Sequence, residues 1–349
     1  MRKILFIDYL GYSGHKNFNK IHINALQRQG WKFDLVGVVG QFNNMNIDNH
    51  VNIIEIKEGF MTRRHASSLL SRLANILLLF KLRNMFKLSD YEYIIFPTYD
   101  VLSLFFFRTK QKVFLINHNN VSQLSSRIKL WMTKNLPLQY FHIALSQEMA
   151  DRLRKLSPFR KCYYIPHGII EPSNQEKKPV FIKEAEKYLF CPVNRNYDKV
   201  LLEKILTSQR VIKYLKKQNI RILIKRISDK ICNSNEIFVI DSRLDKAEYD
   251  YLIKNACAVM IPYEQSFKYR CSGIMFESVA YKTPIIASDI SALRSFENDC
   301  NISFFSDVKS FINSIEQSMY CNKKRHDLGK FNPYPYWKLV IEDIINSNK

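Results

Sequence analysis

The sequence predicts an α/β protein of two halves, each built from a parallel sheet with helices between its strands. Short apolar strands alternate with helical segments along most of the 349 residues, which is the pattern of βαβ units. A polar segment with two prolines, residues 171–180, separates two such stretches. Each stretch is long enough to bury a core of its own.

The first half opens with a Rossmann-like unit. Residues 3–8 are an apolar strand, residues 17–29 a helix that ends at Gly30, and residues 32–39 a second strand. Further strands are predicted at residues 51–57, 93–97, 113–117, 141–146 and 163–165. The loop after the first strand is one where backbone could approach a ligand closely, and it contains Gly11, Gly14 and His15.

Candidate functional residues follow the carboxyl end of the strand at residues 113–117. His118 and Asn119 follow it directly, and functional residues of open α/β sheets collect at that end of the strands. The alternative for a lone histidine, which is the commoner one, is a structural or surface role.

The second half repeats the alternation of strands and helices. Its strands are predicted at residues 188–193, 221–224, 237–240 and 258–262. The polar loop after the first of these strands carries Arg195 and Lys199, which could offset the charge of a phosphate group. The alternative for both cations is a solvated loop.

The stretch at residues 261–289 predicts an anion site. It contains a strand end, a loop, a helix that begins at a Ser-Gly step, and a second apolar strand. The backbone amides of Ser272, Gly273 and Ile274 would point out of the helix N-terminus, where a phosphate is favoured. Glu277 lies one turn further along the same face, where it can accept hydrogen bonds from sugar hydroxyls.

The charge of the chain indicates an anionic partner. Lysine and arginine exceed aspartate and glutamate by 53 to 32, a formal net charge of +21, which suits nucleic acid, an anionic membrane surface or a phosphorylated substrate. An apolar content of 46% and an aromatic content of 13% exclude a disordered chain.

Several absences in the sequence narrow the class of protein. The seven cysteines form no Cys-x-x-Cys pair or metal-spaced His/Cys cluster, and no Asp-x-Asp pair occurs, so we expect reduced thiols in a cytosolic protein and no metal site. Asp8 interrupts the short apolar run at the start, which predicts a strand there and not a signal peptide. No uncharged apolar run approaches the roughly 18 residues that span a bilayer, so we expect a soluble or peripheral protein.

A long basic amphipathic helix is predicted at residues 67–88. Leucines, an isoleucine and phenylalanines share a broad face, and cations stand among them at Arg72, Lys81, Arg83 and Lys87. Such a helix can lie on an anionic membrane or pack on the sheet as a crossover helix, and both can be true of different faces.

These motifs resemble those of GT-B glycosyltransferases, most of all glycosyltransferase family 4 and its relatives in surface polysaccharide synthesis. His118 with Asn119 resembles the family's His-Asp or His-Asn step, which faces the transferred sugar. The other matching segments are the turn at residues 166–168, residues 145–148, the pair Arg195 and Lys199, and Ser272, Gly273, Glu277 and residues 284–288. The resemblance covers nearly the whole length, and residues 261–289 are its specific part.

The resemblance implies two Rossmann-like domains that face each other across a cleft. Residues 1–170 would be the acceptor domain, residues 171–180 a linker and residues 181–332 the donor domain, with a C-terminal helix at residues 333–349 that packs back on the first domain. His118, Arg195 and Lys199 would be catalytic, and the two cations would stabilise the leaving diphosphate.

The activity implied is transfer of a hexose or related sugar from a nucleoside diphosphate sugar to a lipid-linked or polysaccharide acceptor. It would proceed with retention of configuration, without a metal or other cofactor, in capsule, exopolysaccharide or lipopolysaccharide synthesis. The protein would be cytoplasmic and peripheral on the inner face of the cell membrane, where the positive charge meets an anionic surface and an anionic acceptor.

One departure from the family pattern affects the sugar end of the site. The family usually has a second glutamate eight residues before Glu277, and Tyr269 stands there, with Glu264 thirteen residues ahead. Both residues are therefore candidates for contacts with the donor sugar. Two alternatives remain: a non-catalytic partner subunit of the same fold, and a nucleic-acid-binding protein, for which the sequence has charge but no recognisable reading motif.

Overall fold

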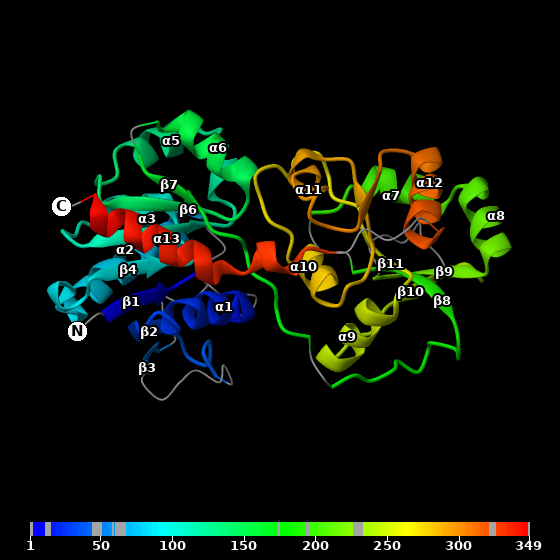
Figure 1. Ribbon diagram of the computed structural model, residues 1–349, viewed down its shortest axis with the longest axis horizontal. Coiled ribbons are helices and arrows are strands. Elements are labelled where there is room, and N and C mark those ends of the chain that lie inside the picture. Colours follow the sequence, from blue (N-terminus) through cyan, green and yellow to red (C-terminus); the bar gives the residue numbers. More distant parts are fainter. Residues whose placement is uncertain are drawn as a thin grey trace. The chain divides into compact units, whose positions relative to one another are not determined.

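The computed structural model divides the chain into two compact units (Figure 1). Unit 1 comprises Met1–Gly168, Tyr269–Cys271 and Asn332–Lys349, and unit 2 comprises Ile169–Lys268 and Ser272–Phe331. The structure describes residues 3–10, 15–43, 51–57, 59, 68–158, 160–172, 175–192, 196–225, 233–320 and 326–347.

Among the described residues, the sheet of unit 1 has seven parallel strands in the order β3-β2-β1-β4-β5-β6-β7. The strands are β1 (Lys3–Asp8), β2 (Lys32–Val38), β3 (Val51–Ile56), β4 (Tyr93–Phe96), β5 (Lys112–Asn117), β6 (Tyr140–Ala144) and β7 (Cys162–Tyr164). The helices are α1 (Lys16–Gln27), α2 (Ser68–Met85), α3 (Val101–Phe106), α4 (Asn120–Gln123), α5 (Arg127–Lys134), α6 (Gln147–Leu156) and α13 (Pro333–Asn346), with a 3-10 turn η1 at Leu88–Asp90.

Strand alternation builds the two apolar layers of unit 1. In β1, Ile4 and Phe6 belong to the core that includes residues of α1, α6 and α13. Leu5 and Ile7 belong to the core on the opposite side, which includes residues of α2 and α3. Because successive side chains of a strand point to opposite faces, an uninterrupted apolar run is what a sheet covered on both sides requires.

The C-terminal helix α13 belongs to unit 1 and packs on α1, as predicted (Figure 1). Trp337 is fully buried, and its indole Nε1 donates to Nδ1 of His22 over 2.9 Å. An indole N–H can only donate, so His22 accepts at Nδ1 and donates from Nε2 to the carbonyl of His167, 3.3 Å away. His22 is therefore neutral, and burial lowers its pKa to about 3.

The described part of unit 2 contains six parallel strands in the order β10-β9-β8-β11-β12-β13. The strands are β8 (Lys187–Cys191), β9 (Ile220–Lys225), β10 (Ile237–Ile240), β11 (Ala258–Ile261), β12 (Ile285–Ser288) and β13 (Ile302–Phe305). The helices are α7 (Lys199–Leu206), α8 (Gln209–Gln218), α9 (Lys246–Asn255), α10 (Gly273–Ala280), α11 (Ser291–Arg294) and α12 (Val308–Tyr320), followed by the 3-10 turn η2 (Leu328–Phe331). Both sheets are parallel and Rossmann-like, which confirms the predicted α/β class. Within the described part of the chain, no helix combines the length and the hydropathy needed to cross a bilayer.

Candidate functional site

The strand order of unit 2 reverses between β8 and β11, and the loops that follow these two strands are joined by backbone hydrogen bonds. The amide of Asp198 donates to the carbonyl of Pro262 over 2.7 Å, and the amide of Glu264 donates to the carbonyl of Asn196 over 3.1 Å. Ligands of open α/β sheets bind outside the strand carboxyl ends at such a reversal. The strand order therefore brings the two predicted loops of the second half to one place.

Helix α10 begins at this reversal with an ordered N-terminus. Ser272 is its N-cap: Oγ accepts from the amide of Met275 over 3.2 Å and lies 3.0 Å from the hydroxyl of Tyr263. Gly273 is exposed, and a Cβ built on it meets no atom within 4 Å. Its φ lies outside the left-handed region, so backbone conformation does not require glycine here. The missing side chain instead leaves the first backbone amides of the helix, those of Gly273 and Ile274, open to an approaching anion.

Glu277 lies one turn into α10 and is held by a residue that the sequence did not indicate. The hydroxyl of Tyr249, on α9, donates to Oε2 of Glu277 over 2.8 Å. Burial raises the pKa of the Glu277 carboxyl, whereas the Tyr249 hydrogen bond and the charge of Lys246 oppose that rise. Tyr249 is 28 positions away along the chain, so no local spacing in the sequence links the two residues.

The other donor-side candidates are distributed between the two units. Lys199 is the first residue of α7, exposed, with Nζ 3.9 Å from Oε1 of Glu203. Glu264 is exposed and accepts from the hydroxyl of Ser266 over 2.5 Å. Tyr269 has a φ of 54° and belongs to unit 1.

The ring of Tyr269 lies below a cation of unit 1, since the guanidinium of Arg152 is 5.4 Å from the ring centroid. Arg195, Gly11 and Gly14 lie outside the described residues.

In unit 1, histidines gather at the carboxyl end of the sheet. His118 follows β5, as predicted, and its ring stacks on that of His15 with 4.7 Å between centroids. Phe18 and His167 also contact the His118 ring, at 4.3 and 6.1 Å between centroids. Nε2 of His118 and Nδ1 of His15 are buried and have no hydrogen-bond partner among the residues that the structure describes. Asn119 is exposed and is the N-cap residue of α4.

The electrostatics of this cluster keep its imidazoles neutral. Burial, followed by the neighbouring charges of His15 and His167, lowers the pKa of His118 well below its usual range. Burial also lowers the pKa of His15, against the opposing effect of the Asp8 carboxylate. His118 can therefore offer a neutral hydrogen-bonding nitrogen near pH 7, but no positive charge.

Asp8 is a buried carboxylate that the sequence did not mark as part of this region. It ends β1 and accepts from Nδ2 of Asn19 over 2.6 Å, Nε2 of Gln41 over 2.5 Å and Oγ1 of Thr98 over 2.6 Å. Three donors offset the cost of burying its charge. They also join the end of β1 to helix α1 and to the loops that follow β2 and β4.

Comparison with known proteins gives a likeness of fold only. No family model matches the chain, and no curated protein matches its sequence. HepE of Anabaena, solved with UDP and glucose, matches with a TM-score of 0.60 at 14% identity over 100% of this chain and 99% of its own. A UDP-forming trehalose-phosphate synthase from Burkholderia xenovorans, solved with glucose-6-phosphate, matches with a TM-score of 0.66 at 12% identity over 98% and 99% of the two chains. The chain has the GT-B fold.

The GT-B fold also serves enzymes that do not transfer sugars to an acceptor. A UDP-N-acetylglucosamine 2-epimerase matches this chain with a TM-score of 0.60 at 9% identity, over 99% of this chain and 96% of its own. The fold prediction is confirmed, whereas the reaction has to be argued from the residues of the site.

Proposed function

We propose that this GT-B protein is a glycosyltransferase that takes a sugar from a nucleoside diphosphate sugar and passes it to a lipid-linked or polysaccharide acceptor. The observation that carries the proposal is the α10 N-terminus at the strand reversal of unit 2, with Gly273 open and Glu277 one turn along the helix. The solved relatives with UDP, glucose or a UDP-sugar analogue are consistent with such a donor.

Each residue of the donor site has a separate role in this proposal. The amides of Gly273 and Ile274 donate to the diphosphate, and the Glu277 carboxylate accepts from a hydroxyl pair of the ribose or sugar. Lys199 and Arg195 offset the charge that develops on the diphosphate as its bond to the sugar breaks. Among the described residues, no three His, Cys, Asp or Glu side chains are grouped to hold a metal ion.

The remaining predicted residues complete the proposal. His118 would serve the transferred sugar as a neutral hydrogen-bonding imidazole, and His15 and Asn119 would border the acceptor loop. Glu264 and Tyr269 are proposed for the sugar end of the donor. We further propose retention of configuration and a place in capsule, exopolysaccharide or lipopolysaccharide synthesis, with the protein peripheral on the inner face of the cell membrane.

A thermal-shift screen against UDP, GDP, ADP and TDP sugars tests the donor class. A ligand that binds only the native state raises Tm, and binding at 100 times Kd adds about 2.7 kcal/mol to the free energy of unfolding. We expect one nucleotide series to raise Tm clearly, and no shift with any of them would contradict the proposal. Incubation with the stabilising sugar then separates the alternatives, because a transferase releases the nucleoside diphosphate, an epimerase converts the sugar, and a non-catalytic subunit does neither.

Gly273→Ala tests the role of the open helix N-terminus. A Cβ here has free space, and alanine is favoured over glycine in a helix by about 1 kcal/mol, so Tm should be unchanged or higher. A methyl group beside the first amides should still hinder a diphosphate, and we expect its Kd to rise about tenfold or more. Isothermal titration with the nucleoside diphosphate measures this. Gly59 in unit 1, which is partly exposed and also has no atom within 4 Å of a Cβ, is the control position, and equal weakening by both variants would argue against the assigned role.

A further inference from the structure

Helix α2 buries one side and leaves an apolar stripe on the other. Its inner side packs into the core of unit 1 through Ala74, Leu78, Leu79 and Leu82. Its outer side exposes Leu69, Leu73, Leu77 and Phe80, each by 42% or more of its surface. These outer residues recur at three- and four-residue spacing, so they form a continuous stripe along the helix. The helix is thus a crossover helix on one face and exposed on the other.

Two neighbouring helices of unit 1 extend this apolar stripe. Helix α2 packs on α3, and α3 packs on α5. Beyond α2, the exposed apolar side chains are Phe106 on α3, Ile128 and Trp131 on α5, and Leu138 after α5. The ring of Trp131 lies against that of Phe105, with 5.6 Å between centroids, which ties α5 to α3.

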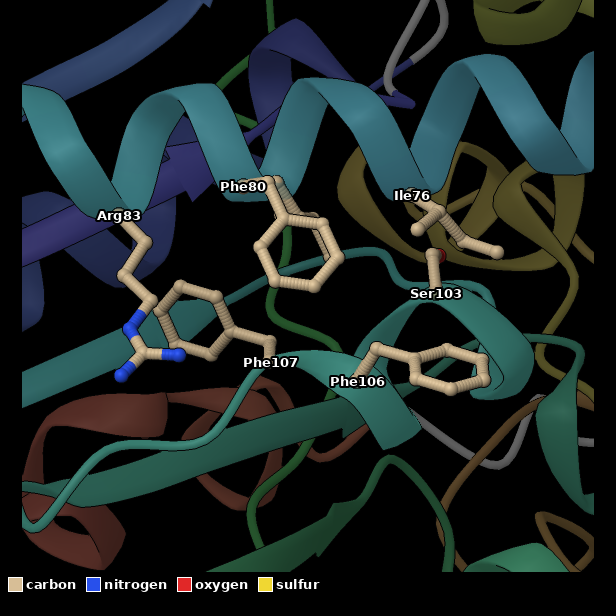
Figure 2. Close-up of a pocket in the computed structure, with 7 residues that line it drawn as sticks. Ile76, Phe80, Arg83, Ser103, Phe106 and Phe107 are labelled. Carbon is tan, nitrogen blue, oxygen red and sulfur yellow. The ribbon is translucent and has the colours of Figure 1, made fainter.

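The junction of α2 and α3 is a shallow pocket (Figure 2). Figure 2 shows Phe80 and Arg83 of α2 directed toward the α3 side, where Phe106 and Phe107 lie. The exposed side chains of Phe80, Arg83 and Phe106 line this pocket together with the buried ring of Phe107, which lies beside the guanidinium (Figure 2). We call the exposed residues of α2, α3 and α5, together with Leu138, the three-helix surface.

The three-helix surface carries positive charge without any negative charge. No aspartate or glutamate occurs at residues 68–85, 101–106 or 127–138, nor anywhere from residue 101 to residue 147. Its exposed cations are Arg72, Lys81, Arg83, Arg127 and Lys134, and Lys129 is partly exposed. On α2 the apolar stripe runs between Arg72 and Arg83 on one side and Lys81 on the other, as follows from 100° per residue.

We propose that the three-helix surface docks on an anionic lipid bilayer. An apolar stripe flanked by cations, with a tryptophan among the exposed residues, is the arrangement that inserts apolar side chains below anionic headgroups while the cations stay at their level. A protein partner would have to supply acidic groups on every side of an apolar ridge. An anionic bilayer has both features, because its charged headgroups overlie its apolar acyl chains. Docking on a bilayer deepens the proposed use of a lipid-linked acceptor, and it can be tested without measuring enzymatic turnover.

Tryptophan fluorescence reports directly on this surface. The chain has three tryptophans, of which Trp31 and Trp337 are buried and Trp131 is 57% exposed. Vesicles of phosphatidylglycerol and phosphatidylcholine should shift the emission to the blue, and lipids brominated on their acyl chains should quench it. In Trp131→Phe, which keeps an aromatic ring, binding should persist while the shift and the quenching disappear. Binding without a blue shift or quenching in the wild type would overturn the proposal.

Charge reversal distinguishes this surface from the general positive charge of the protein. Changing Arg72, Lys81, Arg83 and Arg127 to Glu should weaken vesicle binding at least tenfold in a flotation assay. The control changes Arg210, Lys213, Lys216 and Lys217 of α8 in unit 2, which are also exposed, and has the same net charge. Unchanged Tm in both variants shows that they fold. Equal weakening by the two variants would overturn the proposal, because the attraction would then be unspecific.

Two further outcomes count against a bilayer. Equal affinity for vesicles of pure phosphatidylcholine and for anionic vesicles would remove the role of the cations. A dimer in solution that dissociates on Leu73→Glu would show that a second copy covers the surface. If vesicles bind as expected but no nucleotide sugar stabilises the protein, the docking surface stands and the transferase proposal fails.

Discussion

Glu277→Ala is expected to lower kcat/KM for the nucleotide sugar by at least about 100-fold while leaving the protein folded. Two hydrogen bonds to a carboxylate contribute about 1.5–3 kcal/mol each, and both would be lost. The fold should tolerate the change because burial raises the pKa of Glu277, which means that the folded state holds this carboxylate at a cost. Steady-state kinetics and urea unfolding measure the two effects. Unchanged turnover would refute the donor site.

The Tyr249 hydrogen bond offers a sharper test of the same carboxylate. Because this bond lowers the pKa of Glu277 against the effect of burial, Tyr249→Phe should raise that pKa further. The acidic limb of the pH profile of kcat/KM should then move to higher pH, an effect that lost packing alone would not produce. Tyr251→Phe on the same helix is the control. A Tyr249→Phe profile that overlays the wild type would show that the contact does not position Glu277.

Acidification is expected to unfold unit 1 between about pH 6 and pH 4. Burial lowers the pKa of His22 to about 3, of His142 to about 3 and of His167 to about 4, against an ordinary value of 6.5. The unfolded chain therefore binds more protons than the folded chain in this window, so the stability that the neutral histidines contribute above pH 6.5 is lost as the pH falls. Each histidine contributes about 1.4 kcal/mol per pH unit, and three together approach the whole stability of a domain, about 5–15 kcal/mol, within a few pH units.

A single variant isolates the histidine contribution from that of the carboxylates. His142 is buried on β6. The side-chain amide of its neighbour Asn117 donates to the carbonyls of Leu115 and Ile143, so it keeps these two partners in His142→Leu. The free energy of unfolding, measured by urea titration from pH 7 to pH 5, should fall less steeply in this variant by about 1.4 kcal/mol per pH unit. His326→Leu is the control, because His326 lies in unit 2 and the expected effect concerns unit 1. A slope unchanged by His142→Leu would contradict the burial of a neutral imidazole.

The local sequence was enough to predict the helices and strands that have a strong apolar or helix-start pattern. The apolar run of β1, the Ser-Gly start of α10 and the period of α2 are properties of neighbouring residues, and the structure has all three. The strand β13 was not predicted, because its ISFF segment is only partly buried and too short to show a period. Its place is decided by pairing with β12, a partner that does not appear in its own sequence.

The sequence by itself determined the α/β class, the helix that begins at Gly273 and the spacing that puts Glu277 one turn along it, because a helix repeats every 3.6 residues whatever surrounds it. Only the tertiary structure decided which residues meet at that helix. The pairing of β8 with β11 joins the loop at Asp198 to Pro262, and the packing of α9 brings Tyr249 to Glu277. It also decided that α2 is buried on one side only. Such contacts depend on strand order and helix packing, which arise from the burial of the whole apolar surface and not from any local spacing.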